Sequence, residues 1–286
     1  MPSRGGGGLF GVLAMLFFRG SAKVKIFMLI ILAVGFIFFR GPLMQALGFT
    51  DASLAGGPAT EQVQPDVEDK TRAYLETMIG DNEDVWKSLL PQHNVQYRPA
   101  KMVIYTQATR TPGGLANAQM GPFYLPQNET IYLDPTFFDE LKQKFGASGD
   151  FAEAYVVAHE YGHHIQNILG RLDQLHSQQG RISKTAYNKQ SVRVELHADF
   201  LSGVFAHHAQ SRFKEFLEAG DIEEAMRAAQ AIGDDRLQRD FGSGYVQPDS
   251  FTHGTSAQRA KWFRRGFESG DLRLGEQIYT LPYEQL

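Results

Sequence analysis

The most constraining feature of the chain is a pair of histidines four residues apart, His159 and His163, with Glu160 directly after the first. Residues 151–169, which contain them, are free of proline and largely apolar, as expected of a buried helix. Residues four apart project from the same face of a helix, so the two imidazoles can reach one metal ion. A chain of this composition would contain such a motif about 0.02 times by chance, so the pattern predicts a domain folded around a metal-binding helix.

Zinc suits this arrangement because neutral imidazole is a good zinc ligand and the ion imposes little geometry of its own. Glu160 lies about 100° round the helix axis from His159 and can reach a water on the ion, where a carboxylate serves as general base. Two histidines and a water leave one protein ligand missing. The chain contains no cysteine, so that ligand must be a histidine or a carboxylate.

Glu195 and Asp199 are the candidates for the remaining polar contacts of the site. They lie one turn apart on a predicted helix, residues 190–208, among apolar neighbours. Buried carboxylates need a cation or hydrogen bonds, and zinc ligation by Glu195 with a hydrogen bond from a ligand imidazole to Asp199 would supply both. The alternatives are a solvated acidic face beside Arg193, or ligation by His197, which points about 160° away from Glu195.

Hydrolysis of an amide bond also requires a donor for the oxyanion that forms on the carbonyl group. His253, just before a predicted helix at residues 256–268, is the first candidate, and Tyr245 is the second. Both have a structural alternative. In that alternative, a threonine such as Thr255 caps the helix, and the basic residues that follow, Arg259 among them, form the solvated face of the helix.

The order of elements predicts an α+β fold, in which a small antiparallel or mixed sheet precedes a mainly helical region. The segments predicted as strands are 101–106, 123–125 and 130–133, the last two joined by a tight turn. The segments predicted as helices are 65–79, a short helix capped by Asn82 that ends at Pro91, 137–145, 151–169, 190–208, 211–219, 222–232 and 256–268. Either 123–125 or 130–134 is a candidate edge that pairs with an extended peptide.

The first fifty residues differ from the rest of the chain in charge and hydropathy. They hold five basic residues and no acidic one, so the remainder is acidic and offers no basic face for a nucleic acid. Residues 26–39 form an apolar run that follows Lys23 and Lys25 and ends before Arg40. The excess of basic residues before the run predicts an anchor with its N-terminus inside the cytoplasm and the domain outside. A cleaved signal segment and a soluble amphipathic segment are the alternatives.

These patterns divide the chain into four parts with different physical character. The divisions are a glycine-rich cytoplasmic or interfacial tail at 1–20, a transmembrane anchor region at 21–49, a linker at 50–64 and a folded domain at 65–286.

Five segments together resemble the bacterial neutral zinc metallopeptidase family, and the resemblance covers most of residues 65–270. They are 121–124 (GPFY), 131–134 (IYLD), 145–166, 194–199 (VELHAD) and 252–263 (THGTSAQRAKWF). The resemblance implies a zincin-like, gluzincin-type domain on a single anchor in the bacterial cytoplasmic membrane. It also implies the roles of five residues: zinc ligands His159, His163 and Glu195, catalytic carboxylate Glu160, and Asp199 as hydrogen-bond partner of a ligand.

The sequence therefore predicts a membrane-anchored zinc endopeptidase with one Zn²⁺ per chain, a peptide or protein substrate, and a periplasmic or extracellular domain. One alternative is a non-proteolytic, metal-stabilised membrane protein that scaffolds or binds partners. Glu160 argues against it, because a structural site needs no carboxylate beside an open ligand position. A second alternative is a hydrolase of non-peptide amides.

Overall fold

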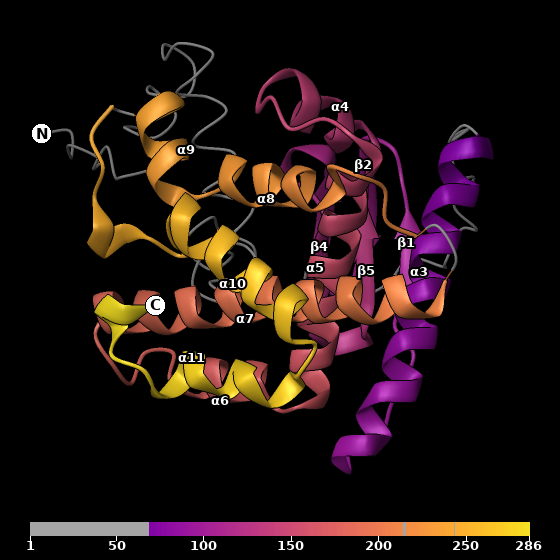
Figure 1. The fold of residues 1–286 in the computed structure, drawn as a ribbon. Helices are drawn as coiled ribbons and strands as arrows, with labels where there is room; N and C mark the ends of the chain where they lie inside the picture. Colours follow the sequence, from indigo (N-terminus) through magenta and orange to yellow (C-terminus); the bar gives the residue numbers. More distant parts are fainter. Residues whose placement is uncertain (1–68, 214–215, 243) are drawn as a thin grey trace, which may run out of the picture.

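Three helices cross at the centre of the structure (Figure 1). They are α5 (Asp150–Ile168), α7 (Lys184–Arg212) and α10 (Ser256–Ser269), and α7 contacts both of the others. The structure is a computed structural model that describes residues 69–213, 216–242 and 244–286.

Local sequence explains where these helices begin. α5 carries Asp150 and Glu153 in its first turn, where acidic groups are favoured by the helix dipole. The Ser183 side chain caps α7 by accepting a hydrogen bond from the Ala186 amide. α10 begins with a capping box, in which Thr255 and Gln258 satisfy each other's backbone amides.

Two glycines allow α7 and α10 to pack backbone against backbone. A Cβ on Gly203 would overlap the carbonyl oxygen of Phe263, and a Cβ on Gly266 would overlap that of Phe200. Any larger residue at either position would push the helices apart. α10 is thereby held close to α7, which carries two of the predicted site residues.

A three-stranded sheet packs against α5. Its order is β1 (Lys101–Ile104), β5 (Thr130–Leu133) and β4 (Phe123–Leu125), with β1 parallel and β4 antiparallel to the central β5. Side chains alternate between its faces: Tyr124 and Ile131 share a core with residues of α5, whereas Phe123 and Tyr132 stack in a smaller core on the other face. That smaller core also includes Ala116 of a separate hairpin, β2 (Ala108–Thr111) and β3 (Gly114–Asn117).

The remaining elements surround this centre. The α-helices are α3 (Asp69–Leu89), α4 (Thr136–Gln143), α6 (Arg171–Ser177), α8 (Asp221–Ala231), α9 (Asp234–Asp240) and α11 (Gln277–Thr280). The 3₁₀ turns are η2 (Leu90–His93), η3 (Ala118–Met120), η4 (Pro126–Asn128), η5 (Pro248–Ser250), η6 (Leu272–Glu276) and η7 (Tyr283–Gln285).

The predicted α+β class is confirmed, with small sheets and mostly helical content. The break predicted at Asn82 is wrong, because α3 runs through it and the fully buried Asn82 side chain donates to the Met78 carbonyl within the helix. Burial of apolar side chains on both sides of Asn82 outweighs its preference for a cap.

The helix predicted at 211–219 is also wrong, because α7 ends at Arg212 and residues 216–218 are irregular. The apolar residues that suggested a helix instead anchor a connection. Phe216 packs against the rings of Phe151 and Phe205, which holds the chain between α7 and α8.

The two candidate edges are now distinguished, since residues 130–133 form the central strand and β4 is the edge of its sheet. The tail, anchor region and linker predicted at 1–64 lie outside the described residues. Among the helices that the structure describes, none is both long and apolar enough to span a membrane.

Candidate active site

The close crossing of α5 and α7 determines the geometry of the site. Gly162 lies between the motif residues, and a Cβ there would come within 3.0 Å of the Ala198 carbonyl oxygen. The glycine therefore permits α7 to approach the ligand face of α5. Glu195, one turn before Asp199 on α7, consequently reaches both histidines of α5.

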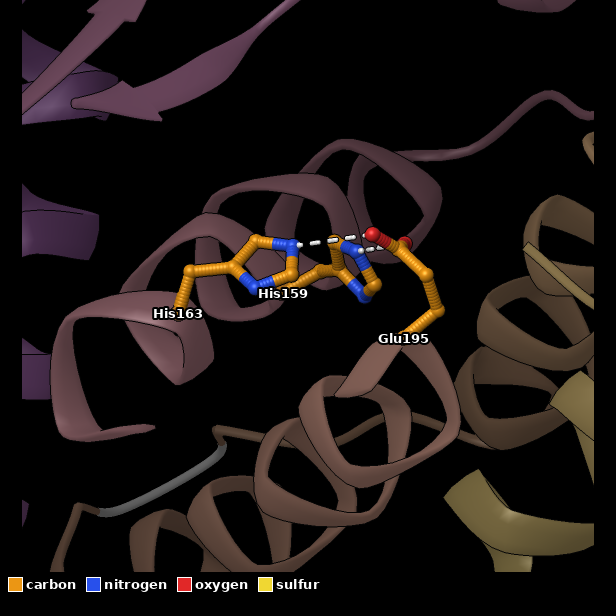
Figure 2. Close-up of side chains that lie close together, drawn as sticks. All are labelled: His159, His163 and Glu195. Carbon is orange, nitrogen blue, oxygen red and sulfur yellow. Dashed lines mark ion pairs between the residues drawn. The ribbon is translucent and has the colours of Figure 1, made fainter. Parts of the chain in front are cut away.

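The predicted ligands His159, His163 and Glu195 come together (Figure 2). The His159 Nε2 atom lies 3.4 Å from Glu195 Oε2, and the His163 Nε2 atom lies 3.7 Å from Glu195 Oε1. One ligand atom from each of the three residues lies within 4.8 Å of the others. A tetrahedral zinc ion with bonds of about 2.1 Å separates its ligand atoms by about 3.4 Å. Two imidazoles and a carboxylate at these distances fit a zinc ion.

Asp199 lies behind His159, as predicted, and belongs to a buried cluster of four polar side chains. Its Oδ1 atom is 2.9 Å from His159 Nδ1 and accepts a 2.5 Å hydrogen bond from the Tyr155 hydroxyl. The Arg259 guanidinium donates to both carboxylate oxygens, from Nε at 2.9 Å and from Nη2 at 3.0 Å. These contacts orient the His159 ring so that Nε2 faces Glu195.

The alternative that places Arg259 on a solvated face is wrong, because its side chain is only 1% exposed. α10 turns this residue inward, where it neutralises the Asp199 carboxylate. Its Nη2 atom also lies 3.4 Å from each ring nitrogen of His159, which places the guanidinium against the face of that ring. The solvated cations of α10 are other residues of the helix.

Electrostatics couples the charge states of this cluster. Burial opposes ionisation of Asp199, but Arg259 and His159 outweigh it and lower the pKa of Asp199 to about 2. Burial likewise opposes protonation of His159, but Asp199 and Glu195 raise the pKa of His159 to about 9. The metal-free His159 is thus protonated at neutral pH. A metal ion must displace that proton, so metal binding weakens as the pH falls.

Glu160 differs from the other two carboxylates of the site. It lines the same cavity and is 8% exposed. Among the residues that the structure describes, none forms a hydrogen bond or ion pair with its carboxylate. Glu195 and Asp199 are held by partners, whereas Glu160 lines the cavity without one among the described residues.

His253 also lines the cavity and is fixed by Asp234, a residue that sequence reasoning missed. The Asp234 Oδ2 atom accepts hydrogen bonds from the backbone amides of residues 252, 253 and 254, and Oδ1 lies 3.1 Å from His253 Nδ1. Burial favours the neutral imidazole, but Asp234 and Glu195 raise the pKa of His253 overall. The structure does not bring Tyr245 to the cavity, since this residue is 78% exposed and does not line it.

Most of the other residues that line the cavity are apolar and form its apolar wall. It includes Ala118, Met120, Gly121, Pro122, Tyr124, Pro126, Phe137, Phe145, Ile232 and Leu237. Part of this wall is the β4 edge strand, whose Tyr124 hydroxyl is held by His164 Nδ1 at 3.0 Å and by Asn167 at 3.1 Å. The cavity therefore has polar lining residues that can hold an ion and apolar lining residues that include part of β4, the edge strand of its sheet among the described residues.

Sequence reasoning missed four residues of the site: Tyr155, Gln166, Asp234 and Arg259. Tyr155 and Gln166 had a local signal, because they lie four residues before His159 and three after His163 and so share a helix face with a ligand. Asp234 and Arg259 had none, since their partners lie 19 and 60 residues away in the chain.

Comparisons with known proteins agree with this geometry. A family model with the description "Putative neutral zinc metallopeptidase" matches residues 1–277. YpfJ of Escherichia coli (strain K12) is 46% identical over 213 residues, which cover 74% of this chain and 73% of YpfJ. Rv2575 of Mycobacterium tuberculosis (strain ATCC 25618 / H37Rv) is 43% identical over 196 residues, 65% of this chain and 64% of Rv2575. No solved structure matches the chain.

Proposed function

The chain belongs to the neutral zinc metallopeptidase family, and from this premise we propose that it is a zinc-dependent endopeptidase with a zincin-like site. The observation that carries the proposal is one cavity lined by three zinc-type ligands and by Glu160, a carboxylate with which no described residue pairs. A purely structural zinc site is closed by four protein ligands, whereas a catalytic site keeps one position open. The cluster of His159, His163 and Glu195 would hold one ion.

The three ligands would hold the zinc ion, and Glu160 transfers the protons. Zinc, when bound, lowers the pKa of its water to about 7 and polarises the substrate carbonyl. The Glu160 carboxylate takes a proton from the attacking water and then delivers it to the nitrogen of the departing amine. Because no described residue pairs with this carboxylate, no internal bond must break before it accepts the proton.

His253 is placed to stabilise negative charge on the carbonyl oxygen. Asp234 accepts at Nδ1 of the ring, and the raised pKa of His253 favours the imidazolium, in which Nε2 also carries a hydrogen that it can donate. The three backbone amides that donate to Asp234 fix that carboxylate, which in turn fixes the imidazole. Tyr245, the second candidate donor, is exposed and does not line the cavity, so it is not proposed for this role.

The substrate is a peptide or an unfolded protein segment in extended conformation. The β4 strand presents an edge beside the catalytic residues, and backbone hydrogen bonds to that edge would bind a peptide without regard to its side chains. The apolar residues around the edge would then discriminate between side chains.

The apolar run at 26–39 supports a single-pass anchor in the bacterial cytoplasmic membrane, with the N-terminus inside and the peptidase domain outside. Fusion of an enzyme that is active only outside the cytoplasm, placed after the last residue, tests this topology. Activity of the fusion supports the proposal. A protein recovered entirely in the aqueous fraction after lysis contradicts the anchor.

The activity is tested with the full chain in detergent and an unfolded protein such as reduced casein. We expect about one zinc per chain, cleavage that stops after treatment with a chelator, and recovery when zinc is restored. Stoichiometric zinc without cleavage of any of several unfolded proteins would favour the scaffold alternative. Absence of bound zinc after exposure to the metal would overturn the site itself.

A further inference from the structure

A fully buried glutamine links the two helices that carry the ligands. Gln166 follows His163 by three residues on α5 and has no exposed surface. Its Nε2 atom donates a 2.6 Å hydrogen bond to the backbone carbonyl of Val194 on α7, the residue before Glu195. Its Oε1 atom lies 2.9 Å from His163 Nδ1.

These two contacts leave one arrangement of hydrogen atoms. A carbonyl oxygen can only accept, so the Gln166 amide must direct its NH₂ group to Val194 and its oxygen to His163. Facing that oxygen, His163 Nδ1 must carry the ring hydrogen and donate it. His163 Nε2 then has a free lone pair, and this is the nitrogen that lies 3.7 Å from Glu195 Oε1 (Figure 2).

The two histidines are therefore supported by different chemistry. His159 is held by a carboxylate that is itself paired with Arg259. His163 is held by a neutral amide that is fixed by a backbone carbonyl. A neutral support adds no charge beside the ion, and its fixed polarity selects one tautomer of the ring.

We propose that Gln166 is a positioning residue that fixes the Nδ1–H tautomer of His163 and ties this ring to the α7 backbone beside Glu195. The chain thereby holds two ligands from different helices in register before metal arrives. This inference rests on the proposed ligand role of His163. It concerns the metal-free chain as well, so it can be tested without cleavage of any substrate.

The test combines histidine tautomers and zinc affinity in the full chain. Long-range ¹H–¹⁵N correlation spectra of the metal-free protein, recorded where the His163 ring is neutral, report which nitrogen carries the hydrogen. Competition with a coloured chelator measures zinc affinity. The variants are Gln166→Met, which keeps the length but removes donor and acceptor, and Gln166→Glu, which keeps the acceptor toward His163.

The matched control is Asn188→Leu. Asn188, like Gln166, has a buried amide side chain, but it lies on α7. Its side chain is 3% exposed and donates a 2.9 Å hydrogen bond to the Asp249 carbonyl without contacting a ligand. Its loss removes a comparable amide-to-backbone hydrogen bond and reports the effect of a structural defect alone.

We expect wild-type His163 to carry its hydrogen on Nδ1, Gln166→Met to lose this preference, and zinc affinity of that variant to fall about 10- to 100-fold. Gln166→Glu should restore the Nδ1–H tautomer, and Asn188→Leu should change neither readout. The inference is overturned by an Nε2–H tautomer in the wild type, or by equal zinc affinity in Gln166→Met and Asn188→Leu. If Gln166→Met does not fold, the wild-type and Gln166→Glu spectra decide the question.

A chain that shows the expected tautomer and binds zinc but cleaves nothing contradicts the proposed function and leaves this inference standing.

Discussion

The two walls of the cavity are built in opposite ways. The ligand wall, comprising Tyr155, His159, His163, Glu195 and Arg259, comes from the central helices α5, α7 and α10, and its polar side chains have partners inside the protein. The apolar wall comprises the residues of 118–126 that line the cavity, together with Phe137, Phe145, Ile232 and Leu237, and it includes a strand edge.

The difference separates two tasks. Groups that must hold a metal ion need fixed positions, and the close crossing of helices in the core supplies them. Groups that bind varied peptides need an apolar surface and free backbone positions, which the sheet edge and loops supply. Substitutions on the ligand wall should therefore alter metal retention or the chemical step, and those on the apolar wall should alter substrate choice alone.

The largest effect is expected from Glu195→Ala, which removes a ligand from the ligand wall. Zinc affinity should fall by more than the roughly 100-fold typical of losing a hydrogen-bond partner of a ligand, and cleavage should disappear. Chelator competition and a cleavage assay measure both. Retention of wild-type zinc affinity would show that Glu195 is not a ligand. It would also contradict the assignment of metal binding to the ligand wall.

Asp199→Asn should destabilise the fold by about 3–5 kcal/mol, because it leaves the buried Arg259 cation without its partner. Denaturation by urea measures the loss. The double variant Asp199→Asn with Arg259→Met removes the unpaired cation and should recover part of the stability. If the single variant were as stable as the wild type, the buried cluster would not hold the ligand wall together.

This cluster also marks the limit of what the sequence alone reveals. The spacing of His159, Glu160 and His163 places them on one helix by geometry alone, and the apolar neighbours of Glu195 indicate a buried carboxylate. Arg259 has the opposite local signal, since a basic residue in a polar helix usually faces solvent. Its burial depends on a carboxylate 60 residues away, which no local pattern reveals.

The fold shows the same limit. Long segments with helical periodicity, such as α5 and α10, were predicted close to their observed bounds. Asn82 and Phe216 were misjudged, because burial among distant residues decided their conformation against local preference. Local periodicity therefore predicts the long helices, and tertiary packing determines where they break.

A smaller effect is expected at His253, the proposed hydrogen-bond donor to the oxyanion. His253→Gln should lower kcat by about 100-fold, the usual scale for loss of one oxyanion donor, with zinc content unchanged. Asp234→Asn, which disturbs the orientation of the ring, should lower kcat less. Steady-state kinetics on a defined peptide separates the two, and an unchanged kcat in His253→Gln would assign this residue a structural role.

The smallest effect is expected on the apolar wall. Met120→Ala removes part of a half-buried apolar side chain that lines the cavity, so KM and the preferred cleavage sites should shift a few-fold, on the scale of about 1 kcal/mol of lost apolar contact. Zinc affinity should equal that of the wild type. Mass spectrometry of cleaved peptides measures the preference, and a loss of zinc in this variant would contradict the division between the walls.

The central claim is that Glu160 moves protons at a metal site that it does not itself form. The most direct measurement is zinc content and protein cleavage in Glu160→Gln, prepared as the full chain beside the wild type. The account predicts about one zinc per chain in both proteins and at least a 100-fold loss of cleavage in the variant, the scale typical of a general base. Cleavage at the wild-type rate by the zinc-loaded variant would contradict it.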